Sequence, residues 1–269
     1  MLAQICENNI KKGINLDNSF EIMNNISKNK KENNITINNE TTEKLFSNLN
    51  SSLPNNINSE NMLSILKNYS TNLSKEQTDI YKDNLPNLMS KYPDNKQSVE
   101  LLDNFVSSSK GEVSQEIVDS FYDGLNSNKP EIKEKYVSIM EKMDSKNIKE
   151  IPSDISNSLI NILKNEKKPE VKNSILNIFQ KNKDKFNLNE NQTNQIETQR
   201  LCYKLDNTLK EKKEDSSPSF SGPLLEKEKE PEKEKELEKE KEDNISPILD
   251  EITKILIISR QRKYLFKIS

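Results

Sequence analysis

The feature that most constrains this chain is a segment that occurs twice, 39 residues apart. NKPEIKEKYVSIM begins at Asn128, and KKPEVKNSILNIF begins at Lys167. Five apolar positions are shared at this spacing: Ile132, Tyr136, Val137, Ile139 and Met140 in the first copy, and Val171, Ile175, Leu176, Ile178 and Phe179 in the second. Intervals of three, four and seven residues are typical of the buried stripe of an amphipathic helix. The repeat therefore predicts two equivalent helices.

Both copies carry the signals of a helix start. Pro130 and Pro169 suit the first turn of a helix, where the missing N–H has no intrahelical partner to lose. Glu131 and Glu170 follow directly, where a carboxylate meets the positive end of the helix dipole. Each copy is thus predicted to begin a helix at its proline.

A second repeated helix precedes each copy. The segment SQEIVDSFYDGL places Ile117, Phe121 and Leu125 on one helical face, and PSDISNSLINIL places Ile155, Leu159 and Leu163 on one face 38 residues later. The repeated unit is therefore a pair of antiparallel helices, or helical hairpin. The change in spacing from 39 to 38 fits loops of variable length around a constant packing stripe.

Neighbouring segments continue the pattern. SKEQTDIYKDNLPNLM opens with Ser74 and Gln77 in the spacing of a capping box, and Gly13 is typical of a helix C-cap. A last long helix is expected around Ile196 to Leu209. We predict an all-α array over residues 1–210, with about five hairpins. Only 31% of the residues are hydrophobic, and an extended array, which buries one stripe of each helix, tolerates this better than a compact enzyme.

The second helix of each pair resembles the second helix of HEAT repeats, in which a turn with the sequence Pro-Glu-Val-Arg leads into a hydrophobic helix. Lys133 and Lys172 stand at the arginine position, and Pro86 resembles the kink-forming proline of HEAT first helices. This resemblance to HEAT/armadillo-like proteins implies a right-handed α-solenoid of antiparallel helical hairpins. It also implies a scaffold that holds other macromolecules on the surface formed by one row of helices.

The sequence offers little for catalysis. It has no histidine, which removes the commonest general base and most zinc sites. Cys6 and Cys202 do not have a metal-binding or redox spacing, and neither GxGxxG nor GxxxxGK(S/T) occurs. We therefore expect no enzyme, no catalytic or metal site and no cofactor. No signal peptide or membrane-spanning run is recognisable, which predicts a cytoplasmic protein.

Two kinds of binding remain as hypotheses. The first is a non-enzymatic protein-binding scaffold that uses the surface of the array. The alternative is nucleic-acid binding through lysines of the second helices, with Lys133, Lys135, Lys142 and Lys172 as candidate contacts. Glutamates alternate with these lysines, and the net charge of the chain is -3. A near-neutral surface favours the protein-binding hypothesis.

The C-terminal part differs from the array. Residues 211–244 are rich in Lys and Glu and poor in apolar residues, which predicts a disordered linker. Residues 245–269 are predicted to form a short amphipathic helix with a basic end. Its candidate binding residues are Ile252, Ile255, Leu256, Arg260, Arg262 and Lys263. We expect this helix to dock on the array, a second copy or a partner protein, and contact with a membrane surface is the less favoured alternative.

Overall fold

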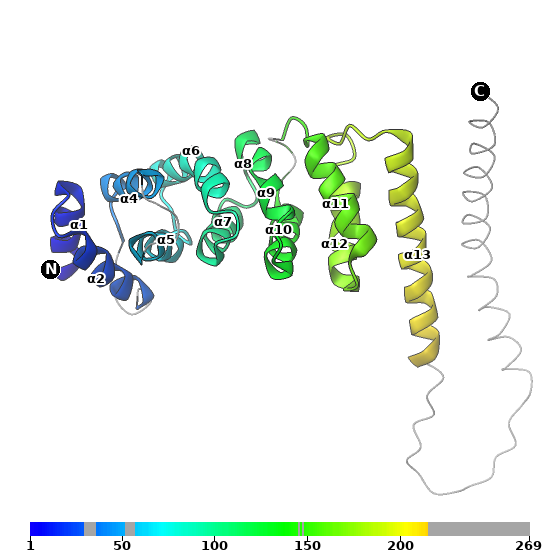
Figure 1. The fold of residues 1–269 in the computed structure, drawn as a ribbon, viewed down its shortest axis with the longest axis horizontal. Helices are drawn as coiled ribbons and strands as arrows, with labels where there is room; N and C mark the ends of the chain where they lie inside the picture. Colours follow the sequence, from blue (N-terminus) through cyan, green and yellow to red (C-terminus); the bar gives the residue numbers. More distant parts are fainter. Residues whose placement is uncertain (30–35, 52–56, 145, 147, 215–269) are drawn as a thin grey trace, which may run out of the picture. The chain divides into compact units, whose positions relative to one another are not determined.

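The structure is a computed structural model, which describes residues 1–29, 36–51, 57–144, 146 and 148–214 (Figure 1). The predicted all-α class is confirmed, because these described residues contain helices and no β-strand. One isolated parallel bridge joins Ile151 to Phe186. The chain divides into two units, Met1–Asn187 and a second that begins at Leu188, and each is described by itself.

The helices of the first unit form two rows, and consecutive helices along the chain belong to alternate rows. The first row consists of α1 (Leu2–Lys12), α4 (Asn39–Ser51), α6 (Lys75–Lys91), α8 (Gln115–Asp119) with α9 (Phe121–Leu125), and α11 (Ser153–Asn165). The second row consists of α2 (Leu16–Lys28), α5 (Ile57–Tyr69), α7 (Lys96–Ser108), α10 (Pro130–Lys142) and α12 (Pro169–Lys181). Each helix contacts its neighbour within the row and its partner in the other row (Figure 1). The predicted pairing of helices is therefore present in the first unit.

The predicted helix signals mark real helix ends. Helices α10 and α12 begin with Pro130 and Pro169 in the first turn, each followed by a glutamate. At α6, the hydroxyl of Ser74 accepts from the Gln77 backbone N–H, while the Gln77 side chain accepts from the Ser74 N–H. Gly13 ends α1 in the left-handed conformation, with φ 69°, which glycine adopts without steric cost. Local sequence chemistry thus sets these boundaries.

The apolar stripes of both repeats lie in the core. Every predicted stripe residue of α10 and α12 is buried except Val171, which is half-buried. Tyr81 of α6 joins neighbouring hairpins, because its ring meets Phe46 edge-on at 5.1 Å and stacks on Phe105 at 6.1 Å. Its hydroxyl donates to the Leu66 carbonyl of α5 over 2.9 Å. One buried tyrosine therefore connects α4, α5, α6 and α7.

One predicted helix is interrupted. The segment SQEIVDSFYDGL forms two short helices, α8 and α9, that meet at Ser120. The hydroxyl of Ser120 donates to the Ile117 carbonyl over 2.7 Å. A serine that bonds the backbone of the preceding turn competes with the helical ladder, which accounts for a break at this position.

The described part of the second unit is α13 (Glu190–Glu214). Asn189 and Gln192 form a reciprocal cap, in which each side-chain oxygen accepts from the other residue's backbone N–H over 2.9 Å. The helix continues past position 210, where the array was expected to end. The remainder of the predicted linker, and the predicted helix over residues 245–269, lie outside the described residues.

Gly124 of α9 provides a test of how closely the two rows pack. A Cβ atom at Gly124 would overlap the ring of Tyr136 in α10. Alanine is the better helix former by about 1 kcal/mol, but overpacking costs about 2 kcal/mol, so we expect Gly124→Ala to lower the free energy of unfolding. Urea denaturation measures this change. The exposed neighbour Asp123→Ala serves as control, and an unchanged midpoint for Gly124→Ala would contradict the packing described.

Candidate functional site

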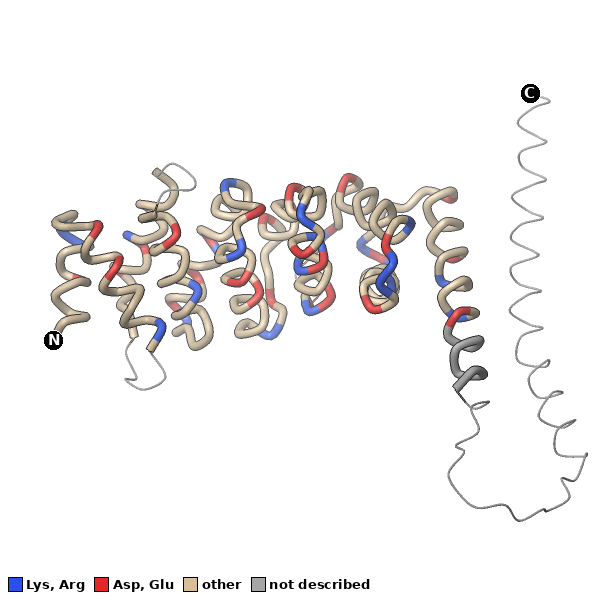
Figure 2. Tube along the Cα trace, turned by 60° about the horizontal axis from the view of Figure 1, so that its bottom comes forward, with Lys and Arg blue, Asp and Glu red and all other residues tan. Residues whose placement is uncertain are grey.

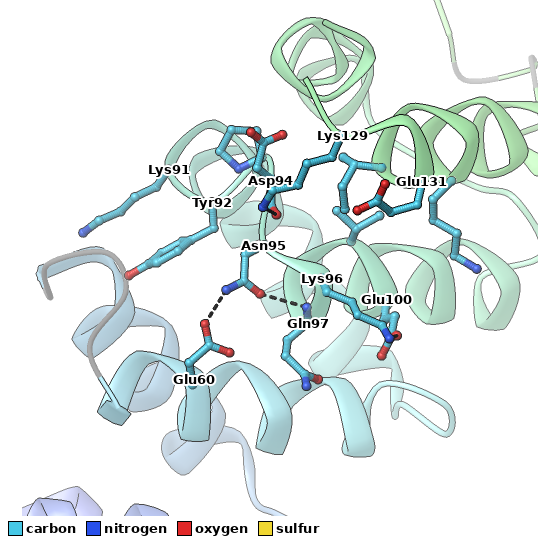
Figure 3. A pocket seen from close by; sticks show the side chains of 14 residues that line it. Glu60, Lys91, Tyr92, Asp94, Asn95, Lys96, Gln97, Glu100, Lys129 and Glu131 are labelled. Carbon is cyan, nitrogen blue, oxygen red and sulfur yellow. Dashed lines mark hydrogen bonds and ion pairs between the residues drawn. The ribbon is translucent and has the colours of Figure 1, made fainter. Parts of the chain in front are cut away.

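A groove of about 1060 Å³ lies at the N-terminal ends of α7 and α10 (Figure 3). Its walls come from α5, from the end of α6 and the loop that follows it, and from the first turns of α7 and α10. The residues that carry its chemistry are Glu60, Lys91, Asp94, Lys96, Gln97, Glu100, Lys129, Glu131 and Lys135. Four lysines and four carboxylates among these make its lining formally neutral.

Asn95 organises the centre of the groove. Its Oδ1 accepts from the backbone N–H of Gln97 and of Ser98, at 2.8 and 3.3 Å, and so caps α7. Its Nδ2 donates to Glu60 Oε1 of α5 over 2.5 Å (Figure 3). An asparagine at this position satisfies helix N–H groups that otherwise lack partners. The same side chain therefore holds the start of α7 against α5.

Lys91 and Lys129 hold neighbouring repeats together next to the groove. The Nζ of Lys91 donates to the carbonyls of Leu49 and Asn50 at the end of α4, at 3.0 and 2.8 Å. The Nζ of Lys129 donates to the Asp94 carbonyl over 3.0 Å. A cation is favourable at the negative end of a helix. These contacts join successive hairpins next to the groove.

Two of the predicted binding lysines are paired within the protein. Lys135 and Lys142 of α10 lie 2.6 and 2.5 Å from the two carboxylate oxygens of Asp103 in α7. The Asp103 side chain is only 15% exposed. Burial raises the pKa of this carboxyl, but the hydrogen bonds and charges of the two lysines outweigh burial and lower it. Lys135 and Lys142 thus hold α10 against α7.

The other predicted lysines are not brought together at the groove. Lys133 and Lys172 are half-buried at equivalent positions of α10 and α12, and neither forms an ion pair with a described residue. Neither lines the groove. The predicted binding residues Ile252, Ile255, Leu256, Arg260, Arg262 and Lys263 lie outside the part of the chain that the structure describes.

Of the residues that line the groove, sequence reasoning named only Lys135 as a binding residue and missed those that build its walls. Pro93 and Asp94 precede Asn95, and an asparagine after such a turn is a helix N-cap signal that could have located the start of α7. The bond from Asn95 to Glu60 spans 35 residues and has no comparable local signal. The groove therefore depends on contacts between repeats.

Polar contacts also link every pair of successive second-row helices. Asn24 of α2 donates to Asn61 of α5 at 2.8 Å, and Lys67 of α5 lies 3.0 Å from Glu100 of α7. Between α10 and α12, Lys168 next to the start of α12 lies 2.6 Å from Glu134. Acidic and basic positions are interspersed along the first unit (Figure 2).

Comparisons with protein families, curated proteins and solved structures found no match for this chain. Within the described ranges, no three or more acidic or cysteine side chains are grouped so that they could hold a metal ion. No helix among the described residues has the length and apolar character needed to cross a membrane.

The Asp103 ion pairs lead to a pH-dependent prediction. Because the pKa of Asp103 is lowered in the folded protein, its contribution to stability is present above the carboxyl's ordinary pKa and is lost as the pH falls through the folded value. We expect Asp103→Asn to lower the free energy of unfolding by about 1 kcal/mol at neutral pH.

The difference in unfolding free energy between the Asp103→Asn variant and the unmodified protein should vanish as the solution is acidified. Urea unfolding from neutral pH downward measures it, and Asp79→Asn, at an exposed position of α6, is the control. A deficit that stays constant into strong acid would contradict the assigned ion pairs.

Proposed function

We propose that the first unit is a HEAT-like, right-handed α-solenoid that acts as a non-enzymatic scaffold for a protein partner. The contacts between successive helices of each row support this architecture, as does the repeat of the stripe at 39 residues. Stacked hairpins of this kind offer an extended surface for binding. The fold class alone assigns no activity, so the proposal depends on the groove.

The observation that carries the proposal is the mixed, formally neutral lining of the groove. A protein surface presents both charges together with apolar groups, and it can match such a lining. The buried side chains of Val99 and Ile132 also contribute to the lining. The volume of about 1060 Å³ is at the upper end of small-ligand pockets and suits a short polypeptide segment.

The same lining weighs against the nucleic-acid alternative. Glu60, Asp94, Glu100 and Glu131 would repel phosphate groups at the groove. Two of the candidate lysines are paired with Asp103, so they cannot contact phosphates without leaving that carboxylate unpaired. Of the four candidate lysines, only Lys133 and Lys172 form no ion pair with a described residue and could contact phosphates without breaking one.

Salt dependence separates the two functions. The partner is captured with the full chain and purified, and its affinity is then measured at about 50 mM and about 500 mM salt. We expect a protein complex whose affinity changes by less than about tenfold, since salt screens partly buried ion pairs weakly and does not screen apolar contacts. A nucleic-acid complex would lose about a thousandfold or more, and that result would replace the proposed function with the alternative.

The unpaired lysines give a second test. Because Lys133 and Lys172 do not line the groove, we expect the double variant Lys133→Glu, Lys172→Glu to bind the protein partner within about threefold of the unmodified chain. Calorimetry measures the affinity, and the double variant Lys164→Glu, Lys167→Glu, at exposed positions outside the groove, controls for the change in net charge. Selective loss of binding in the Lys133→Glu, Lys172→Glu variant would place the binding site outside the groove.

A further inference from the structure

The groove lysines all have partners inside the protein. Lys91 and Lys129 donate to backbone carbonyls, and Lys135 is paired with Asp103. Lys96 is the most loosely held, since its Nζ lies 3.9 Å from Glu100 Oε1 and its side chain is 83% exposed. The hydrogen-bond donors and positive charges of the groove are therefore largely committed.

Some hydrogen-bond acceptors of the groove have no donor among the described residues. The carboxylates of Asp94 and Glu131 receive neither an ion pair nor a hydrogen bond from any residue that the structure describes. Asp94 Oδ1 and the side-chain oxygen of Gln97 are shielded from solvent and accept no hydrogen bond within the described structure. Glu131 is exposed, so water solvates its carboxylate. At Asp94, which is half-buried, an ionised carboxylate that has lost part of its hydration is unfavourable until a donor or cation compensates it.

The two carboxylates lie on two segments of the groove lining that Lys129 joins. Lys129 binds the backbone carbonyl of Asp94, and Glu131 follows Lys129 by two residues in the chain. The close view shows Asp94 on the loop between α6 and α7, and Lys129 and Glu131 at the start of α10 (Figure 3). The unmet requirement for donated hydrogens and positive charge thus lies at Asp94, and Glu131 adds a second, exposed carboxylate at the start of α10.

We infer that the groove binds an extended segment of a partner protein through a basic side chain, an arginine, that donates to the carboxylates of Asp94 and Glu131. Several N–H groups in a planar fork suit two carboxylates, and the aliphatic stem can lie along the apolar lining formed by Val99 and Ile132. This inference rests on the proposed function and specifies the chemistry of its partner.

Short peptides test the inference on the full chain. The probe is acetyl-Gly-Ser-Arg-Ser-Gly-amide, and its matched control replaces arginine with uncharged citrulline. Amide chemical shifts are followed by NMR up to about 10 mM peptide, a range that detects weak complexes. We expect the arginine peptide to shift residues 93–97 and 129–132. The citrulline peptide should leave them unchanged.

Variants assign the effect to the carboxylates. Asp94→Asn combined with Glu131→Gln should weaken binding of the arginine peptide by about tenfold or more. Glu170→Gln is the matched control, because Glu170 holds the equivalent position in the first turn of α12 and does not line the groove. Thermal unfolding of both variants checks that the fold is kept.

Three results would overturn the inference: equal shifts with citrulline, undiminished binding in the double variant, or no shifts at the groove at the highest peptide concentration. Binding of the purified partner distinguishes failure of the arginine contact from failure of the proposed scaffold function. A partner that binds the double variant as tightly as the unmodified chain would refute the arginine contact while leaving the scaffold intact. Absence of any protein partner would refute the scaffold.

Discussion

The packing of Tyr136 connects the core of the first unit to its groove. Its ring meets Phe121 of α9 edge-on at 5.4 Å and occupies the space that a side chain on Gly124 would fill. Its hydroxyl donates to the Pro93 carbonyl over 3.3 Å, in the loop that forms one wall of the groove. Burial, followed by the charges of Asp94 and Asp123, raises the pKa of this phenol. The neutral hydroxyl therefore remains a donor, and core packing holds the groove wall in place.

This arrangement follows from how few apolar residues the chain has. With 31% hydrophobic residues, each helix buries one stripe, and that stripe must serve both its hairpin partner and the next repeat. Between helices of the second row, polar side chains supplement the apolar contacts, as the pairing of Lys135 and Lys142 with Asp103 shows. Ion pairs whose lysines are partly exposed contribute modestly to stability. Their larger effect is to set which helix faces lie opposite one another.

The sequence predicts the parts of the fold that are encoded within one helix. Pro130, Pro169, Ser74 and Gly13 act within a few residues of their own positions, so local patterns locate the helix ends. The break at Ser120 was missed because the apolar spacing on either side of it is unbroken. The groove was missed for a different reason, since its walls are joined by side chains 35 residues apart, such as Asn95 and Glu60. Lys135 and Lys142 of α10 were predicted to be free to contact a ligand, because no pattern in their own segment indicates that they pair with Asp103 of α7.

One difference between equivalent positions explains why the unpaired carboxylates occur between α7 and α10. At the start of α12, Lys168 is paired with Glu134 of the preceding second-row helix. Its equivalent at the start of α10 is Lys129. Helices α7 and α10 each have 13 residues, so the residue of α7 that corresponds to Glu134 is Glu100. Glu100 is paired with Lys67 of α5 at 3.0 Å, and Lys129 bonds the Asp94 backbone instead. Because Glu100 pairs with the preceding repeat, the start of α10 lacks the ion pair that α12 has, and the carboxylates of Asp94 and Glu131 remain available to a basic side chain.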